Sequence, residues 1–151
     1  MKKKINYTYL IEIYESPANL PASFAKHTWF VVTKKGRKTR YEILMRKNIK
    51  QELGYFHINF LPPYSGLFIF PIDIPFFFKS KKLGEIKGNS NSQAEKMAQF
   101  IKKSIHTYPY INNYHLLGPN SNTYTQYVLN QFPECKARLN TTHIGRHYKL
   151  N

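Results

Sequence analysis

The chain has 151 residues, of which 23 are Lys or Arg and 8 are Asp or Glu, and its formal net charge is +15 at pH 7. This length predicts a single domain over residues 1–151, and a hydrophobic fraction of 42% excludes an intrinsically disordered chain. The single cysteine, Cys135, excludes an internal disulfide framework and a zinc site built from cysteines.

The N-terminal half of the chain is predicted to form β-strands, because apolar residues recur there at every second position. The predicted strands cover residues 5–13, 24–33, 39–46 and 53–60. The apolar run at residues 67–78 is interrupted by two prolines and an aspartate, so it predicts one or two short strand segments. This run is too short to cross a bilayer as a helix, and no transmembrane segment is expected.

Two helices are predicted in the C-terminal half. Ser92 and Glu95 have the spacing of a capping box, and apolar residues at helical spacing follow them. A second helix should start near residues 120–123 and run to about Asn130, and residues 141–150 predict a last strand. This order of elements predicts an α+β fold, with a mostly antiparallel sheet and at least two helices packed on one side.

The turn at Lys35-Gly36 predicts the register of a β-hairpin. A two-residue turn there pairs Lys34 with Arg37 and places Trp29 opposite Glu42. One face of the hairpin is then core-like and carries Phe30, Val32, Tyr41 and Ile43. On the other face, His27 and Glu42 are diagonal neighbours, so the carboxylate can orient the imidazole. The alternative is an ordinary half-exposed hairpin with a surface histidine.

Short polar residues crowd the predicted start of the second helix, from Asn120 to Thr123. Such side chains are typical of helix caps, and capping alone accounts for their presence. The second interpretation is catalytic, because a hydroxyl at a helix N-terminus lies beside backbone N–H groups that can stabilise an oxyanion. A serine would also need a histidine nearby in space as its base.

The segment from Tyr114 to Tyr124, YHLLGPNSNTY, resembles the hallmark of an uncharacterised bacterial family, whose members carry a G-P-N-S-N-T-aromatic string near the C-terminus. The resemblance covers residues 22–148. It extends to His27-Thr28-Trp29, Arg40-Tyr41-Glu42, Tyr108-Pro109-Tyr110 and Ile144-Gly145-Arg146. His147 stands where the family pattern leads us to expect an acidic residue.

More remotely, the chain resembles circularly permuted papain-like proteins, a group that includes NlpC-type amidases and lecithin:retinol-type acyltransferases. In that group a strand histidine precedes an N-C-x-x-aromatic helix start, as His27 precedes the string from Asn120 to Tyr124 here. Ser121 stands in the place of the cysteine, and a serine hydroxyl needs stronger base assistance than a thiol.

The papain-like resemblance implies a catalytic role for three residues. Ser121 would be the nucleophile, His27 the general base and Glu42 the group that orients His27. Backbone N–H groups near Asn122 would hold the oxyanion. The residues expected to contact substrate or shape its site are Trp29, Asn120, Asn122 and Tyr124. The implied activity is that of a hydrolase or acyltransferase acting on an amide or ester, with no metal and no cofactor.

The alternative function is a non-catalytic binding module, a pseudoenzyme, for a polyanion such as nucleic acid or anionic lipid. Its basis is the net charge of +15 and the clusters of basic residues. These clusters lie at residues 2–4, 34–38, 79–82 and 102–103. A polyanion binder would be indifferent to loss of Ser121, and its affinity would fall steeply with salt.

The remaining candidates for chemistry are expected to have none. His143 and His147 form only a loose pair without a carboxylate ligand at metal-binding spacing, and no catalytic role is predicted for Cys135. The basic start at residues 2–4 is not followed by a continuous apolar stretch, so no classical signal peptide is expected. A cytoplasmic location is therefore predicted, with non-classical secretion as the alternative.

Overall fold

The computed structural model describes residues 6–18, 25–68 and 77–149. These ranges contain five strands and two helices. The strands are β1 (Tyr9–Pro17), β2 (Lys26–Lys34), β3 (Arg37–Ile43), β4 (Phe56–Ile58) and β5 (Lys81–Gly88). The helices are α1 (Gln93–Thr107) and α2 (Ser121–Gln131).

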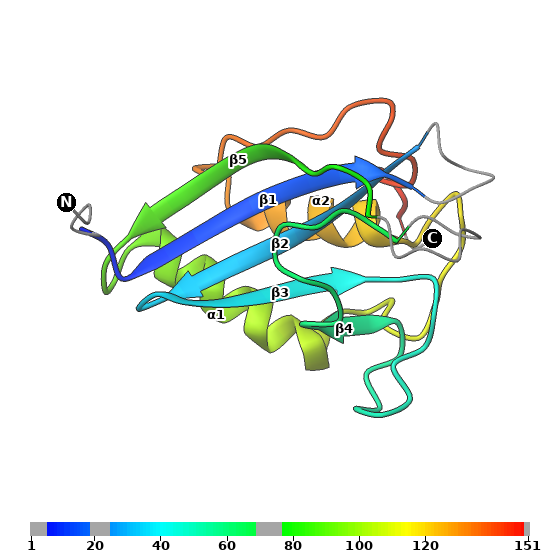
Figure 1. Ribbon diagram of the computed structural model, residues 1–151, viewed down its shortest axis with the longest axis horizontal. Coiled ribbons are helices and arrows are strands. Elements are labelled where there is room, and N and C mark those ends of the chain that lie inside the picture. The colour runs from blue at the N-terminus through cyan, green and yellow to red at the C-terminus, as the bar shows by residue number, and fades with distance from the viewer. Residues whose placement is uncertain (1–5, 19–24, 69–76, 150–151) are drawn as a thin grey trace.

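The five strands form one antiparallel sheet in the order β4-β3-β2-β1-β5, and both helices lie on the same face of it (Figure 1). Helix α1 packs against β1 and β5, whereas α2 packs against β2 and β3. The predicted α+β fold, with a mostly antiparallel sheet and two helices on one side, is confirmed. After β4, the residues around Pro63 and Tyr64 cross the opposite face of the sheet.

The predicted hairpin register is confirmed. Lys34 pairs with Arg37 and Phe30 pairs with Tyr41. The turn between them has positive φ at both central residues, 48° at Lys35 and 81° at Gly36, which is the geometry of a tight two-residue hairpin turn. Because the side chains alternate along each strand, this register directs one set toward the helices and the other toward the opposite face.

The core lies between the sheet and the two helices and is rich in aromatic side chains. Phe30 and Phe56 each meet the ring of Tyr124 edge-on, with ring centroids 5.8 and 5.1 Å apart. The four residues expected on the core-like face of the hairpin are all buried in this cluster. The alternative of a half-exposed hairpin is wrong, because His27 on the other face is also buried, with only 5% of its surface exposed.

Strand β5 was not predicted. Its sequence is polar and contains two glycines, so it lacks the hydrophobic alternation by which a half-buried strand is recognised. It forms the edge of the sheet beside β1, where lysine side chains are common because they discourage pairing with other chains. Gly84 is needed at its position, since a Cβ there would come within 2.9 Å of the Ala137 Cβ.

Other predicted boundaries also differ from the structure. Strand β1 extends to Pro17, whereas the prediction ended at residue 13, and β3 ends at Ile43 rather than at residue 46. The predicted last strand is wrong, because residues 141–149 form turns with no strand pairing. The predicted strand at residues 53–60 is reduced to β4. Within the predicted segment 67–78, Phe68 and Phe77 form an isolated antiparallel bridge, and the residues between 69 and 76 lie outside the described ranges.

Both predicted helix starts are confirmed. The Ser92 side chain caps α1 by accepting the Glu95 N–H, and Asn120 caps α2. Neither helix in the described part of the chain is long and apolar enough to cross a membrane.

Candidate active site

His27 and Glu42 form a buried hydrogen-bonded pair between β2 and β3. His27 Nε2 lies 2.8 Å from Glu42 Oε2, as the hairpin register predicted for diagonal neighbours. Burial raises the pKa of Glu42, but the hydrogen bond and charge of His27, together with Arg40, outweigh this and leave the pKa below its ordinary value. An ionised carboxylate only accepts hydrogen bonds, so Nε2 of neutral His27 carries the proton and Nδ1 holds the lone pair.

Arg40 supports Glu42 and was not assigned a role from the sequence. Its Nη2 donates to Glu42 Oε2 at 2.8 Å, and its Nη1 donates to the carbonyl oxygens of Pro62 and Ser65. The guanidinium lies 4.1 Å from the ring centroid of Trp29 and is fully buried. Arg40 and Glu42 are two residues apart on one strand and therefore share a face, a spacing that could have revealed the pair.

The imidazole of His27 is held in its neutral form. Burial lowers the pKa of His27 below its ordinary value of 6.5, the hydrogen bond and charge of Glu42 act in the opposite direction, and Arg40 adds to the lowering. In the described part of the chain, no protein group hydrogen-bonds Nδ1. His27 therefore has the protonation state of a general base with one ring nitrogen available.

The start of α2 is capped by Asn120 rather than by Ser121. The Asn120 Oδ1 accepts the N–H groups of Asn122 and Thr123, and the Thr123 hydroxyl accepts the Asn120 N–H. The Asn122 N–H, which was expected to hold an oxyanion, is therefore already bonded to Asn120 Oδ1, and that expectation is corrected. The hydroxyl and the N–H of Ser121 have no hydrogen-bond partner among the described residues.

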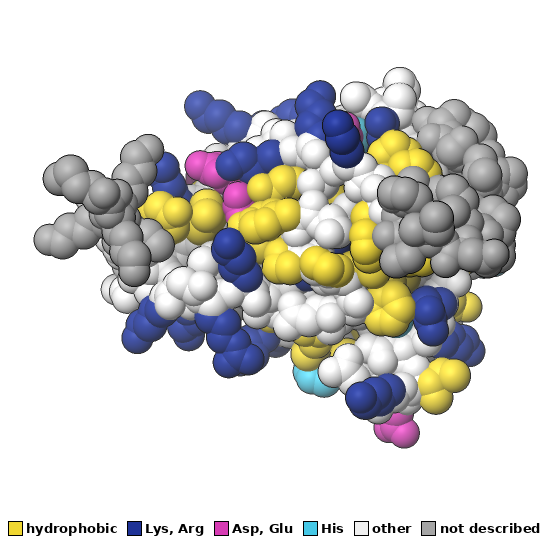
Figure 2. Space-filling model, in the orientation of Figure 1, with side chains coloured by type: hydrophobic (Ala, Val, Ile, Leu, Met, Phe, Trp, Pro, Cys, Tyr) yellow, Lys and Arg dark blue, Asp and Glu magenta, His cyan; other side chains and the backbone are white. Residues whose placement is uncertain are grey.

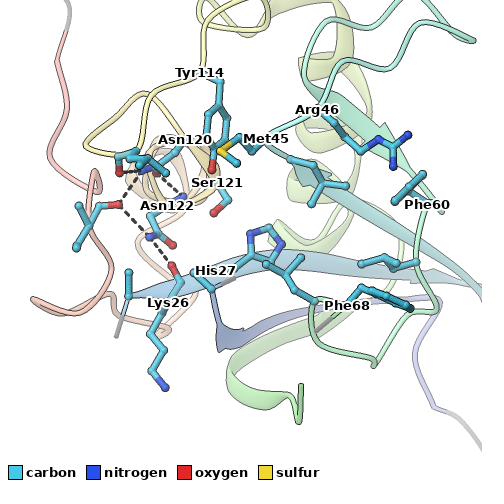
Figure 3. Close-up of a pocket in the computed structure, with 17 residues that line it drawn as sticks. Lys26, His27, Met45, Arg46, Phe60, Phe68, Tyr114, Asn120, Ser121 and Asn122 are labelled. Carbon is cyan, nitrogen blue, oxygen red and sulfur yellow. Dashed lines mark hydrogen bonds between the residues drawn. The ribbon is translucent and has the colours of Figure 1, made fainter. Parts of the chain in front are cut away.

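His27 and Ser121 line the same pocket, which has a volume of about 330 Å³ (Figure 3). They approach it from different elements, because His27 lies at the start of β2 and Ser121 is the first residue of α2. The pocket is also lined by Ala18, Ala25, Lys26, Leu44, Met45, Arg46, Phe60, Leu61, Leu67, Phe68, Tyr114, Leu116, Asn120, Asn122 and Ile144.

Trp29 and Tyr124, which were expected to contact substrate, do not line this pocket. Tyr124 is buried in the core, where its hydroxyl lies 2.7 Å from the Ser104 hydroxyl. Trp29 is buried under the segment that crosses the sheet and donates its indole N–H to the Pro63 carbonyl at 2.9 Å. Trp29 stacks on the ring of His27, with the ring centroids 5.7 Å apart, and so supports it from behind.

Asn122 lines the pocket, but its side chain is fully engaged with the protein. Its Nδ2 donates to the Lys26 carbonyl at 2.8 Å and to the Ile144 carbonyl at 3.0 Å. Its Oδ1 accepts from the Thr28 hydroxyl at 3.0 Å. Asn122 therefore ties the helix that carries Ser121 to the strand that carries His27.

The C-terminal segment, residues 140–148, completes this arrangement. The Thr142 carbonyl accepts the Lys26 N–H at 3.0 Å, and the Gly145 carbonyl accepts the Thr123 hydroxyl at 2.7 Å. The segment is anchored to β1 by His143, whose Nε2 lies 2.7 Å from Glu15 Oε2. No local pattern in the sequence indicates this contact, because 128 residues separate its two partners.

We expect Asn122→Ala to lower the free energy of unfolding by about 1–3 kcal/mol, because the part-buried Lys26 carbonyl would lose its side-chain donor, the Ile144 carbonyl would lose one of two and the buried Thr28 hydroxyl would lose an acceptor. Gln126→Ala is the matched control, since Gln126 lies on the same helix and makes only an exposed hydrogen bond to Asn130. Chemical denaturation measures both variants. An equal, small effect of the two substitutions would contradict the linking role of Asn122.

The other candidates for chemistry are not grouped with this site. In the described ranges, no three His, Cys, Asp or Glu side chains are close enough together to hold a metal ion. His143 is buried against Glu15, whereas His147 is exposed. Cys135 is buried outside the pocket, and burial raises the pKa of its thiol.

A family model described as a protein of unknown function (DUF3750) matches residues 8–148. This range contains β1 through α2, together with the C-terminal segment up to Tyr148. No curated protein and no solved structure matches the chain significantly. The hallmark string and the likeness to papain-like proteins remain predictions. The predicted membership of an uncharacterised family is confirmed, and the chain belongs to the DUF3750 family.

Proposed function

We propose that the protein is a serine-dependent hydrolase or acyltransferase that acts on an ester or amide. The observation that carries this proposal is the buried Glu42–His27 pair beside a pocket that Ser121 also lines. The Ser121 hydroxyl and His27 Nδ1 are both without a partner among the described residues. A nucleophile, a base and a group that orients the base are the three parts that acyl transfer by serine requires.

The proposed reaction has two steps. First, the Ser121 Oγ forms a bond to the carbonyl carbon while His27 Nδ1 accepts the hydroxyl proton. The bond from the carbonyl carbon to the leaving oxygen or nitrogen then breaks, and His27 gives the proton to the leaving group. Next, water or an acceptor alcohol or amine attacks the acyl-serine. His27 moves the proton again, and this step releases the acyl product and restores Ser121.

The start of α2 favours this chemistry electrostatically. The Ser121 N–H is a free helix N-terminal donor, so it is better suited to the oxyanion than the Asn122 N–H, which is already bonded to Asn120. The positive end of the helix dipole also favours the negative charge that develops beside Ser121. Each such donor contributes about 3–4 kcal/mol to stabilising a tetrahedral intermediate where it has been measured.

Glu42 and Arg40 together fit the role of orienting His27 as the base. Glu42 Oε2 accepts from both His27 and Arg40, so the carboxylate cannot rotate without breaking a bond to each of them. Arg40 also keeps Glu42 ionised, because its buried positive charge lowers the pKa of the carboxyl. The imidazole is thereby fixed with Nε2 toward Glu42 and with Nδ1 as the basic nitrogen.

Polyanion binding has less support. On the face shown in Figure 2, the Lys and Arg side chains are spread around the molecule and do not form one continuous stripe. A surface that follows a phosphate backbone needs its cations on one face. The net charge of +15 is still a reason to measure nucleic-acid affinity against salt concentration as the competing test.

A fluorophosphonate probe and a short p-nitrophenyl ester test the proposal. We expect Ser121→Ala to abolish labelling and to lower esterase activity at least about a thousandfold, with the fold retained. Activity should rise with pH to a midpoint below 6.5, because only neutral His27 accepts the proton.

Ser90→Ala is the matched control, because Ser90 is exposed and lies outside the pocket. This variant should keep both labelling and activity. An unlabelled wild-type protein, or labelling that survives Ser121→Ala, would contradict the catalytic proposal.

A further inference from the structure

We infer that the acyl group of the substrate is a hydrocarbon chain that lies along the pocket away from Ser121. This inference rests on the proposed function, since it names the substrate class of the same site. Most of the side chains that line the pocket are apolar, and they come from six separate parts of the chain. The apolar lining residues are Ala18, Ala25, Leu44, Met45, Phe60, Leu61, Leu67, Phe68, Leu116 and Ile144.

The polar lining residues offer few groups to a polar substrate. The amide groups of Asn120 and Asn122 already donate to backbone carbonyls, two bonds from each side chain. Beyond Ser121 and His27, the Tyr114 hydroxyl and the cations of Lys26 and Arg46 are the main polar groups left in the lining. A peptide or sugar in this pocket would lose its hydrogen bonds to water without replacement, which costs about 1–3 kcal/mol for each buried group.

The apolar side chains at the mouth of the pocket are exposed. Met45 is 67% exposed, Leu116 is 56% exposed and Phe60 is 47% exposed. Exposed apolar side chains that line one pocket are typical of a binding site. A hydrocarbon chain would cover these side chains and gain hydrophobic free energy in proportion to the area removed from water.

The arrangement in Figure 3 gives the acyl chain a direction. Ser121 and His27 lie on one side of the pocket, with Met45 above Ser121, and Phe60 and Phe68 lie on the other side. With its carbonyl at Ser121, an ester would extend its acyl chain toward the two phenylalanines. The released acid would carry its carboxylate at the Ser121 end of the pocket.

The first test is a series of p-nitrophenyl esters with acyl chains of increasing length, from acetate to dodecanoate. We expect kcat/KM to rise roughly threefold to fourfold for each added methylene until the pocket is filled. Leu116→Glu, in the lining, should remove this increase. Leu117→Glu is the matched control, because Leu117 is its neighbour, is 78% exposed and does not line the pocket.

The second test separates this inference from the proposed catalysis by measuring binding to the Ser121→Ala variant. Calorimetric titration below the critical micelle concentration should give much tighter binding of dodecanoate than of butyrate. Ser121-dependent esterase activity that does not rise with chain length would overturn the inference and leave the catalytic proposal standing. Length-dependent binding by a protein that turns over no ester would support the chain-binding pocket and contradict the catalysis.

Discussion

Replacing Glu42 with leucine is expected to lower the free energy of unfolding by about 3–5 kcal/mol, because it would leave the buried guanidinium of Arg40 without an anionic partner. Arg40 is fully buried, and its link to Glu42 is a 2.8 Å charge-assisted hydrogen bond. His27 would also lose the acceptor of its Nε2 proton. Urea denaturation of the purified variant measures the change.

Two further variants show whether this loss comes from the unpaired charge. Arg40→Met combined with Glu42→Leu should recover part of the stability, since it removes both charges, although the carbonyls of Pro62 and Ser65 lose their donor. Glu85→Gln should cost less than about 1 kcal/mol, because Glu85 pairs with Lys82 at the surface. If Glu42→Leu lowered the free energy of unfolding no more than Glu85→Gln does, the buried Arg40–Glu42 pair would contribute little to stability.

Lowering the pH below about 6.5 is expected to destabilise the fold. Burial lowers the pKa of His27, His57 and His143, so below the ordinary value of 6.5 the unfolded chain binds protons that the folded chain does not. The histidine contribution is therefore fully present above 6.5 and is lost as pH falls toward the folded pKa values. Each such proton changes the free energy of unfolding by about 1.4 kcal/mol per pH unit.

Denaturation curves at pH 7.5, 6.5 and 5.5 measure this dependence. His143→Gln should reduce the number of protons taken up on unfolding by about one. His106→Gln is the matched control, because His106 is exposed in the folded chain. Glu42 adds a second loss of stability at lower pH. Its pKa is also lowered, so its contribution to the free energy of unfolding disappears as the pH falls below about 4.5. Equal stability at pH 7.5 and 5.5 would contradict the buried, neutral state of these histidines.

Local sequence rules determine part of the site, and this part could be predicted. The turn Lys35-Gly36 fixes the hairpin register, and the register alone brings Glu42 within reach of His27. The cluster of short polar residues likewise locates the start of α2 and hence Ser121. Both inferences depend on contacts within a few residues or across one tight turn.

The rest of the site depends on contacts between distant segments, for which the sequence carries no local signal. The C-terminal segment was expected to be a strand, but its Ile144 carbonyl instead accepts hydrogen bonds from the side chains of both Asn120 and Asn122. Tyr124 was expected near the substrate because of the resemblance to the papain-like pattern. In the structure, α2 packs on the sheet so that Tyr124 meets Phe30 and Phe56 in the core.

The position of the C-terminal segment has a consequence for biosynthesis. The carbonyls of Thr142, Ile144 and Gly145 hold the start of β2 and the start of α2 in place. A growing chain therefore contains His27 and Ser121 before the carbonyls that hold β2 and α2 together have been synthesised. Any prematurely terminated product that lacks these residues would contain both side chains without these contacts.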